Sequence, residues 1–220
     1  MDTLIIEKKN EVYITVDCDP NVQRELSEFF TFYVPGYKFM PAFRNRMWDG
    51  KIRLFSQKTK EIYFGLFPYI KAFAEEREYH IVCGKDVEVK NKVDKDIVEK
   101  FSNSLGQKFE ARDYQVDAIY HSLKYNRALL LSPTASGKSF IIYALIRYYT
   151  HLIKDETNNR ILLIVPTTSL VEQMYSDFKS YGWNVEKNCH RLYSGYSNQT
   201  DKKVLISTWQ SLYKLPKEYF

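Results

Sequence analysis

The feature that most constrains the fold is a polar turn containing one glycine, placed between two apolar segments. Residues 128–131 are apolar, Ser132–Ser139 reads Ser-Pro-Thr-Ala-Ser-Gly-Lys-Ser, and an apolar helical pattern follows over Phe140–Leu152. A short apolar strand, a tight turn and a helix in this order are typical of a parallel sheet, whose strands are joined by helices. We therefore predict a strand at Ala128–Leu131 and a helix opening at Lys138.

The turn itself has the composition of a phosphate-binding loop. Backbone N–H groups of such a loop, and of the helix that follows, bind phosphate oxygens. Lys138 is expected to place its ammonium by the β- and γ-phosphates, Ser139 to offer a hydroxyl to Mg²⁺, and Gly137 to let the backbone approach the phosphates closely. The strict pattern begins with glycine, where this chain has Ser132. Ala135 replaces a second common glycine and is acceptable if its φ is negative. An ordinary turn with a solvated lysine is the alternative.

Strands and helices alternate through the rest of this half of the chain. We predict amphipathic helices at Arg112–Tyr125 and Ser169–Tyr181, buried strands at Ile161–Val165 and Val204–Ser207, and a helix starting over Trp209–Leu215. The alternation predicts a parallel sheet covered by helices on both faces.

The first half of the chain has a different pattern, typical of a small α+β domain. Asp19-Pro20 offers an N-cap and a first-turn proline for a helix. Polar Ser56–Glu61 separates two apolar runs and suggests a hairpin. The predicted elements are a strand at 12–16, a helix after Asp19, the hairpin Lys51–Phe55 with Ile62–Leu66, a helix at Pro68–Tyr79 and a strand at His80–Cys83.

A charged segment poor in large apolar side chains separates the two halves. We read residues 84–108 as a linker with one short helix near Ile97–Leu105. The predicted organisation is a small α+β domain at 1–83, the linker at 84–108, and a second α/β domain at 109–220.

Composition narrows the setting in which the chain works. The net charge of +5 permits a nucleic-acid partner without requiring one. Cys18, Cys83 and Cys189 are far apart and odd in number, which favours reduced thiols in a cytoplasmic protein over a zinc site. Apolar runs long enough for a membrane span are absent, and the N-terminal Met-Asp-Thr-Leu-Ile-Ile-Glu-Lys-Lys is not a signal peptide.

Positive charge is concentrated in one stretch of the first domain. Between residues 38 and 60 there are seven Lys and Arg residues and a single acid, Asp49, with Phe and Trp residues interleaved. Cationic heads bind phosphates and flat rings stack on exposed bases, so this stretch is a candidate DNA-binding surface. A solvated hairpin face with core aromatics is the alternative. The residues predicted to contact DNA here are Arg44, Arg46, Trp48, Lys51 and Arg53.

Three segments of the second half resemble motifs of superfamily 2 helicases, in the order found in that family. They are Arg112-Asp-Tyr-Gln115, Pro166-Thr-Thr-Ser-Leu-Val-Glu-Gln173 and Ser207-Thr-Trp-Gln-Ser-Leu212. The first resembles an adenine-recognising motif, in which Gln115 reads the adenine edge and Arg112 assists. The other two resemble motifs that hold a nucleic-acid backbone at strand ends. A polar helix start, helix caps and a core Trp209 are the corresponding alternatives.

This resemblance completes the predicted site. It implies a RecA-like lobe that binds ATP with Mg²⁺, with Lys138 and Ser139 catalytic and Ser139 reaching the metal through the nucleotide. The predicted nucleotide-binding residues are Arg112, Gln115, Pro133, Thr134, Ala135, Ser136, Gly137, Lys138 and Ser139. The further predicted DNA contacts are Pro166, Thr167, Thr168, Thr208 and Trp209.

The stretch Phe43-Arg-Asn-Arg-Met-Trp-Asp-Gly-Lys-Ile-Arg-Leu-Phe55 resembles the N-terminal domain of UvsW-type recombination helicases of T4-like bacteriophages. That family joins such a domain to a RecA-like motor. The resemblance implies ATP-driven unwinding of branched DNA and RNA–DNA hybrids in recombination-dependent replication and repair. It also implies a place in the cytoplasm of an infected bacterium, with replication or recombination proteins as possible partners.

The chain departs from the family in one respect. Neither Asp-Glu-x-His nor Asp-Glu-Ala-Asp occurs, although superfamily 2 motors hold Mg²⁺ with such a box and add an arginine finger from a second lobe. We therefore expect a truncated first lobe that binds nucleotide and DNA without turnover. Two other functions stay open. One is a restriction motor subunit, in which Glu88-Val-Lys90 would belong to a nuclease. The other is a non-enzymatic DNA-binding or annealing module.

Overall fold

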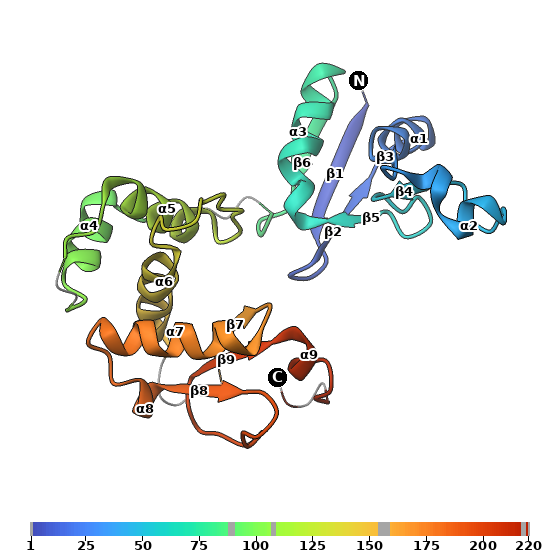
Figure 1. The fold of residues 1–220 in the computed structure, drawn as a ribbon. Helices are drawn as coiled ribbons and strands as arrows, with labels where there is room; N and C mark the ends of the chain where they lie inside the picture. Colours follow the sequence, from blue (N-terminus) through green and yellow to red (C-terminus); the bar gives the residue numbers. More distant parts are fainter. Residues whose placement is uncertain (1, 88–90, 107–108, 154–158, 217–218, 220) are drawn as a thin grey trace. The chain divides into compact units, whose positions relative to one another are not determined.

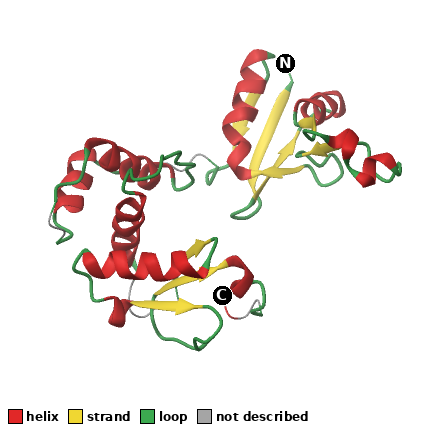
Figure 2. Ribbon diagram, viewed as in Figure 1, coloured by secondary structure: helices red, strands yellow, loops and turns green. Residues whose placement is uncertain are grey.

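The computed structural model describes residues 2–87, 91–106, 109–153, 159–216 and 219. Contacts between Cα atoms divide the chain into two units, Met1–Val89 and Lys90–Phe220. Figures 1 and 2 show a mixed α/β architecture, with a sheet and helices in each unit.

The first unit is built on a four-stranded sheet in the order β5-β2-β1-β6. β1 (Thr3–Lys8) and β2 (Tyr13–Asp17) are antiparallel, β2 pairs antiparallel with β5 (Glu61–Tyr63), and β1 pairs parallel with β6 (His80–Cys83). A second, two-stranded sheet joins β3 (Thr31–Tyr33) to β4 (Lys51–Arg53).

The two ten-residue helices of this unit bury one apolar side each. α1 (Pro20–Phe29) begins at the predicted N-cap, where the Asp19 carboxylate accepts a hydrogen bond from the Asn21 amide at 2.8 Å. α3 (Phe67–Glu76) follows a 3₁₀ turn, η2 (Phe64–Leu66). The core comprises Leu4, Ile6, Ile14, Val16, Val22, Leu26, Phe30, Phe55, Ile62, Phe67, Ile70, Phe73 and Val87.

Two predictions for this unit need correction. Residues 3–8 form β1, which the sequence analysis missed. The predicted hairpin between Lys51–Phe55 and Ile62–Leu66 is wrong, because only the isolated bridge Ser56–Glu61 joins the two runs. β4 instead pairs with β3, and β5 pairs with β2. Each run finds its partner through tertiary packing, which a local apolar pattern does not specify.

The second unit begins with helices. α4 (Lys95–Asn103) lies within the segment predicted as a linker, and it buries Val98 in the core of this unit. α5 (Asp113–Tyr125) packs against α4 and against α6 (Lys138–Leu152). The predicted helix opening at Lys138 is confirmed.

A parallel sheet in the order β7-β9-β8 forms the other part of this unit. β7 (Ile161–Val165) and β9 (Val204–Thr208) match the predicted strands, whereas β8 (Cys189–Leu192) was missed. Helix α7 (Thr168–Ser180) packs on all three strands, and α8 (Val185–Asn188) and α9 (Trp209–Leu212) are single turns. The predicted α/β class with a parallel sheet, preceded by a small domain, is confirmed.

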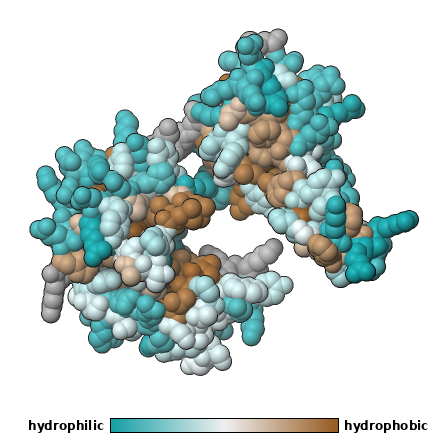
Figure 3. Space-filling view, turned by 45° about the horizontal axis from the view of Figure 1, so that its top comes forward, coloured by the Kyte–Doolittle hydropathy of each residue, from teal (hydrophilic) through white to brown (hydrophobic). Residues whose placement is uncertain are grey.

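The strand predicted at Ala128–Leu131 is absent from the structure. None of β7, β8 and β9 pairs with it, and the side chains of Leu129 and Leu131 are 85% and 90% exposed. A strand takes its backbone hydrogen bonds from neighbours, so an apolar run alone does not make one. Figure 3 shows brown, apolar patches on the surface of the molecule. The exposed apolar residues of the second unit include Leu129, Leu131 and Ile164.

The described residues also bear on disulfides, membrane spans and metal clusters. Cys18, Cys83 and Cys189 form no disulfide. Among the described helices, none has the length and apolar character that crossing a bilayer requires. No group of three or more His, Cys, Asp or Glu side chains in the described ranges is placed to hold a metal ion.

Candidate nucleotide site and nucleic-acid surfaces

The candidate phosphate loop enters helix α6 through a left-handed residue. Gly137, the N-cap, has φ 79° and ψ 35°. Ala135 also has a positive φ, of 65°. The condition under which alanine was acceptable at this position, a negative φ, is therefore not met. Alanine adopts the left-handed conformation at a cost of about 1–2 kcal/mol.

Hydrogen bonds within the loop hold the side chain of Lys138 against the loop backbone. The Lys138 ammonium donates to the carbonyls of Ser132 (3.1 Å) and Pro133 (2.8 Å). The hydroxyl of Ser136 donates to the Pro133 carbonyl at 2.8 Å and also contacts the Ser132 hydroxyl. Ser139 is half-buried in the first turn of α6. Pro133 and Thr134 are exposed. Lys138 and Ser139 lie in the first turn of α6, at the positive end of a 15-residue helix.

Helix α5 supports the loop from one side. The Ser136 carbonyl accepts two hydrogen bonds, one from the Tyr114 hydroxyl at 3.0 Å and one from Gln115 Nε2 at 3.2 Å. Gln115 is 4% exposed, and its Oε1 accepts from the Arg112 backbone amide at 3.0 Å. The Arg112 guanidinium donates to the Tyr114 hydroxyl at 2.8 Å. The structure thus places Gln115 against the loop, where it bridges two pieces of backbone, and it places Arg112 next to Tyr114 and Gln115.

Tyr114 is a residue that the sequence analysis left out. It stands between Arg112 and Gln115 in the segment already singled out. Its position one residue before Gln115, on the first turn of the same helix, was the only available signal. The bond to Ser136 arises from tertiary packing, over a separation of 22 residues.

Gly137 and Ala135 both have a positive φ, so adding a side chain at 137 and removing one at 135 should have opposite effects on stability. A Cβ at position 137 would lie 2.2 Å from Gln115 Nε2, in addition to the strain at φ 79°. We expect Gly137→Ala to weaken ATP binding and to lower the melting temperature, since a left-handed alanine alone costs about 1–2 kcal/mol and 1 kcal/mol corresponds to about 2–4 °C. Ala135→Gly is the matched control and should leave the melting temperature unchanged or raise it. Shifts of both variants in the same direction would contradict this account of the loop.

The parallel sheet brings two predicted DNA-contacting segments to one edge. Val165 at the end of β7 lies opposite Thr208 at the end of β9. Pro166, Thr167 and Thr168 follow β7 and are exposed. Thr167 caps helix α7, where its hydroxyl accepts a hydrogen bond from the Leu170 amide at 3.3 Å.

At the end of β9, the Trp209 ring is exposed to solvent, whereas the Thr208 hydroxyl is on a buried residue. Thr208 is 5% exposed, and its hydroxyl contacts that of Ser211 at 3.0 Å. Trp209 is 57% exposed and lies 6.4 Å from the ring of Tyr213. The core alternative for Trp209 is therefore wrong, and the exposed side chains at this edge are Pro166, Thr167, Thr168 and Trp209.

The cationic stretch of the first unit forms a distinct surface, which we call the cationic tip and define as residues 37–53. It contains the 3₁₀ turn η1 (Tyr37–Phe39), the short helix α2 (Pro41–Arg44) and β4. Arg44 and Arg46 are exposed, and within the described ranges neither forms an ion pair. These two guanidinium groups are the most available cations of the tip.

The other three predicted residues of the tip, Trp48, Lys51 and Arg53, already interact with neighbouring groups of the protein. The Trp48 indole donates to the Lys51 carbonyl at 2.9 Å, and the Lys51 ammonium lies 4.9 Å from the centre of the Tyr33 ring. Arg53 pairs with Asp49. The bonds from the Arg53 side chain and the Lys51 amide hold the pKa of Asp49 below its ordinary value, so this acid stays ionised at neutral pH. Trp48 is half-buried, which falls between the two alternatives considered for it.

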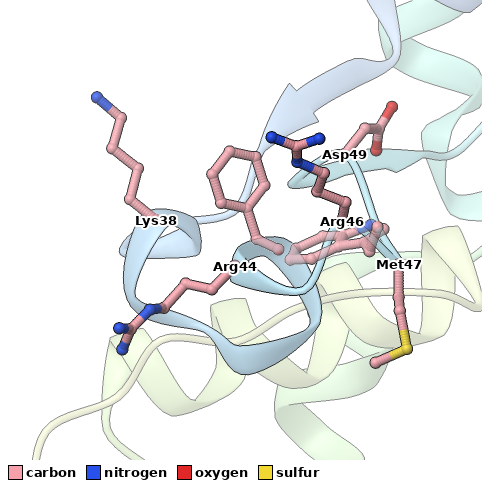
Figure 4. A pocket seen from close by; sticks show the side chains of 7 residues that line it. Lys38, Arg44, Arg46, Met47 and Asp49 are labelled. Atoms are coloured by element: carbon pink, nitrogen blue, oxygen red, sulfur yellow. The ribbon is translucent and has the colours of Figure 1, made fainter.

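An open pocket of about 590 Å³ lies in the tip. Figure 4 shows Lys38 and Arg44 extending on one side and Met47 on the other. Two aromatic rings, Phe43 and Trp48, also line the pocket. The sequence analysis had not singled out Lys38, Phe43 or Met47 as site residues, although all three lie inside the cationic stretch.

Comparisons with known proteins agree with this arrangement. Residues 5–84 match a family model described as DNA helicase UvsW, N-terminal, and residues 108–219 match one described as type III restriction enzyme, res subunit. The ATP-dependent DNA helicase uvsW of Enterobacteria phage T4 is 33% identical over 217 residues, which are 94% of this chain and 42% of that protein.

Two solved structures of the UvsW helicase of bacteriophage T4 resemble the whole chain. One has a TM-score of 0.85 at 31% identity, with 100% of this chain and 79% of the solved chain covered. The other has a TM-score of 0.86 at 32% identity and is covered over 45% of its length. The chain spans less than half of the curated relative, but both of its units have counterparts there. The chain therefore belongs to the UvsW family of DNA helicases.

Proposed function

We propose that this chain is the nucleotide- and DNA-binding portion of an ATP-dependent DNA helicase. One observation carries the proposal. A loop with a left-handed glycine places Lys138 and Ser139 at the start of a long helix, and two side chains of α5, those of Tyr114 and Gln115, donate hydrogen bonds to that loop. Backbone amides, a lysine and a hydroxyl in this arrangement suit a phosphate chain.

The residues present fit ATP with Mg²⁺. Gly137 has a left-handed backbone that glycine adopts without strain, and a Cβ there would meet the side-chain amide of Gln115 at 2.2 Å. A phosphate in the loop would compete with the carbonyls of Ser132 and Pro133 for the Lys138 ammonium. Ser139 would meet the metal through its hydroxyl, and Arg112 and Gln115 would lie on the adenine side. Bound ATP would supply the phosphoanhydride whose hydrolysis drives the motor.

We assign DNA binding to two surfaces. One is the sheet edge of Pro166–Thr168 and Trp209, where hydroxyls, amides and a ring suit a strand backbone. The other is the cationic tip. Stacking needs unpaired bases, so branched and single-stranded DNA are proposed substrates. The likeness to UvsW helicases adds RNA–DNA hybrids as proposed substrates and recombination-dependent replication and repair as the proposed process. The proposed setting is the cytoplasm of a phage-infected bacterium, with replication and recombination proteins as possible partners.

Residues 1–220 alone are not expected to turn over ATP. Lys138 and Ser139 are present, but an Asp-Glu box and a second lobe with an arginine finger are not among these residues. The measurement is phosphate release by the purified chain with and without single-stranded DNA, beside a nucleotide-binding titration that proves the loop competent. DNA-stimulated release that is lost in Lys138→Ala would show that these residues hold a complete catalytic site.

Two alternatives are separable by experiment. For a restriction motor subunit, Glu88-Val-Lys90 would be nuclease residues. They lie outside the described residues, and the test is metal-dependent DNA cleavage by the longer protein. For a non-enzymatic module, the loop would be structural only. ATP binding that is equal in the chain and in Lys138→Ala would favour that reading.

A further inference from the structure

We propose that the pocket in the cationic tip binds a single unpaired nucleobase, with the phosphates on either side held by Arg44 and Arg46. This inference rests on the proposed DNA binding by the tip and gives it a defined site. It follows from three properties of the pocket: aromatic walls, unpaired cations at its rim, and a rigid frame.

The aromatic walls are Phe43 and Trp48, which line the pocket together with Met47. The ring of Phe43 meets Tyr37 edge-on at 4.8 Å between centroids, and Tyr37 stacks on Tyr33 at 4.7 Å. Nucleobases stack on such rings whatever their identity, because every base has a π-face. The aromatic walls therefore favour any unpaired base over a paired one, and they do not distinguish one base sequence from another.

Charge at the rim matches a nucleic-acid backbone. Lys38, Arg44 and Arg46 line the pocket. The one acid that lines it, Asp49, accepts bonds from Arg53 and from the Lys51 amide, so its charge is largely compensated. An apolar ligand would leave these cations unused, whereas a nucleotide would place its base between the rings and its phosphates on the guanidinium groups.

The frame around the pocket is held by main-chain contacts. The indole of Trp48 is fixed by its bond to the Lys51 carbonyl, and the Met47 amide donates to the Ala42 carbonyl at 2.9 Å. Gly50 has φ 79°, and a Cβ there would lie 2.3 Å from a ring carbon of Tyr37. The aromatic walls are thus positioned before DNA arrives, which lowers the entropic cost of binding.

Met47 is the side chain best placed to cover a bound base. It is 74% exposed and lines the pocket, whereas Phe39, 85% exposed on the same tip, does not. Met47→Ala and Phe39→Ala are therefore a matched pair. Each removes one exposed apolar side chain, but only the first changes the pocket.

The experiment compares a short oligothymidylate with an abasic oligomer that has the same number of phosphates. The chain should bind the oligothymidylate about tenfold more tightly. Met47→Ala should reduce this preference and Phe39→Ala should preserve it. A second readout uses the chain with Trp183→Phe and Trp209→Phe, in which Trp48 is the sole tryptophan. Its fluorescence should be quenched by oligothymidylate and not by the abasic oligomer, with circular dichroism confirming that the variant is folded.

The outcomes distinguish binding of a base in the pocket from binding of DNA by the cationic tip as a whole. Trp48 fluorescence that stays constant while oligothymidylate binds would overturn the pocket, and so would loss of the base preference in Phe39→Ala rather than in Met47→Ala. Charge reversal at Arg44 and Arg46 should weaken both oligomers and leave their ratio unchanged. If that reversal weakens neither oligomer, the proposed DNA-binding role of the tip fails as well.

Discussion

Replacing Lys138 with alanine is expected to lower the ATP affinity of this chain by about tenfold or more. The variant loses charge-assisted hydrogen bonds to phosphate, which are worth about 1.5–3 kcal/mol. The fold should survive, because Lys138 is exposed and bonds only to loop carbonyls. In a longer protein that contains these residues, the same change should abolish ATP hydrolysis.

Titration calorimetry or a fluorescent nucleotide measures the affinity, and circular dichroism checks the fold. Lys187→Ala is a suitable control, since Lys187 is another exposed lysine of the second unit. Its affinity for ATP should equal that of the unmodified chain. An ATP affinity for Lys138→Ala as high as that of this control would remove the basis for the phosphate-loop assignment.

Charge reversal at Arg44 and Arg46 is expected to weaken binding to every DNA substrate together. Each arginine that contacts a phosphate releases condensed counterions, so the logarithm of the affinity falls linearly with the logarithm of the salt concentration. Losing two such contacts should reduce this slope by about two. Branched DNA should remain preferred over duplex, because the walls of the pocket are unchanged.

Affinity is best measured by fluorescence anisotropy over a series of salt concentrations. The double variant Arg24→Glu/Lys85→Glu makes the same change in net charge at exposed positions of the first unit outside the tip. Binding of branched DNA by folded Arg44→Glu/Arg46→Glu that equals binding by this control would exclude the tip as a DNA surface.

The sequence predicted the helices of this protein better than its strands. Asp19 with Pro20, and the apolar pattern after Gly137, are local signals, and α1 and α6 begin where they indicate. β8 is only four residues long and contains His190 and Arg191, so no apolar run marked it. Residues 128–131 had the apolar pattern of a strand, but they lack a neighbour with which to pair.

The candidate site shows the same division between local and tertiary signals. The order of residues in the loop suggested Lys138 and Ser139 as site residues, and helix α6 starts at that point. The sequence could not reveal that Gln115 is buried between two backbone segments, or that Ala135 has a positive φ. Both depend on how α5 meets the loop. Likewise, the composition of the tip predicted charge and aromatic rings, but not that some of them surround a pocket.

The two hydrogen bonds that the Ser136 carbonyl accepts from α5 have a thermodynamic consequence. Because of them, the conformation of the loop and the folding of the first turn of α5 are energetically coupled. A perturbation that frays this turn must lower the affinity for nucleotide. By reciprocity, bound nucleotide must stabilise the turn by the same factor. Occupancy of the phosphate loop is thereby coupled to the stability of the first turn of α5, which joins the loop through the Tyr114 and Gln115 side chains described above.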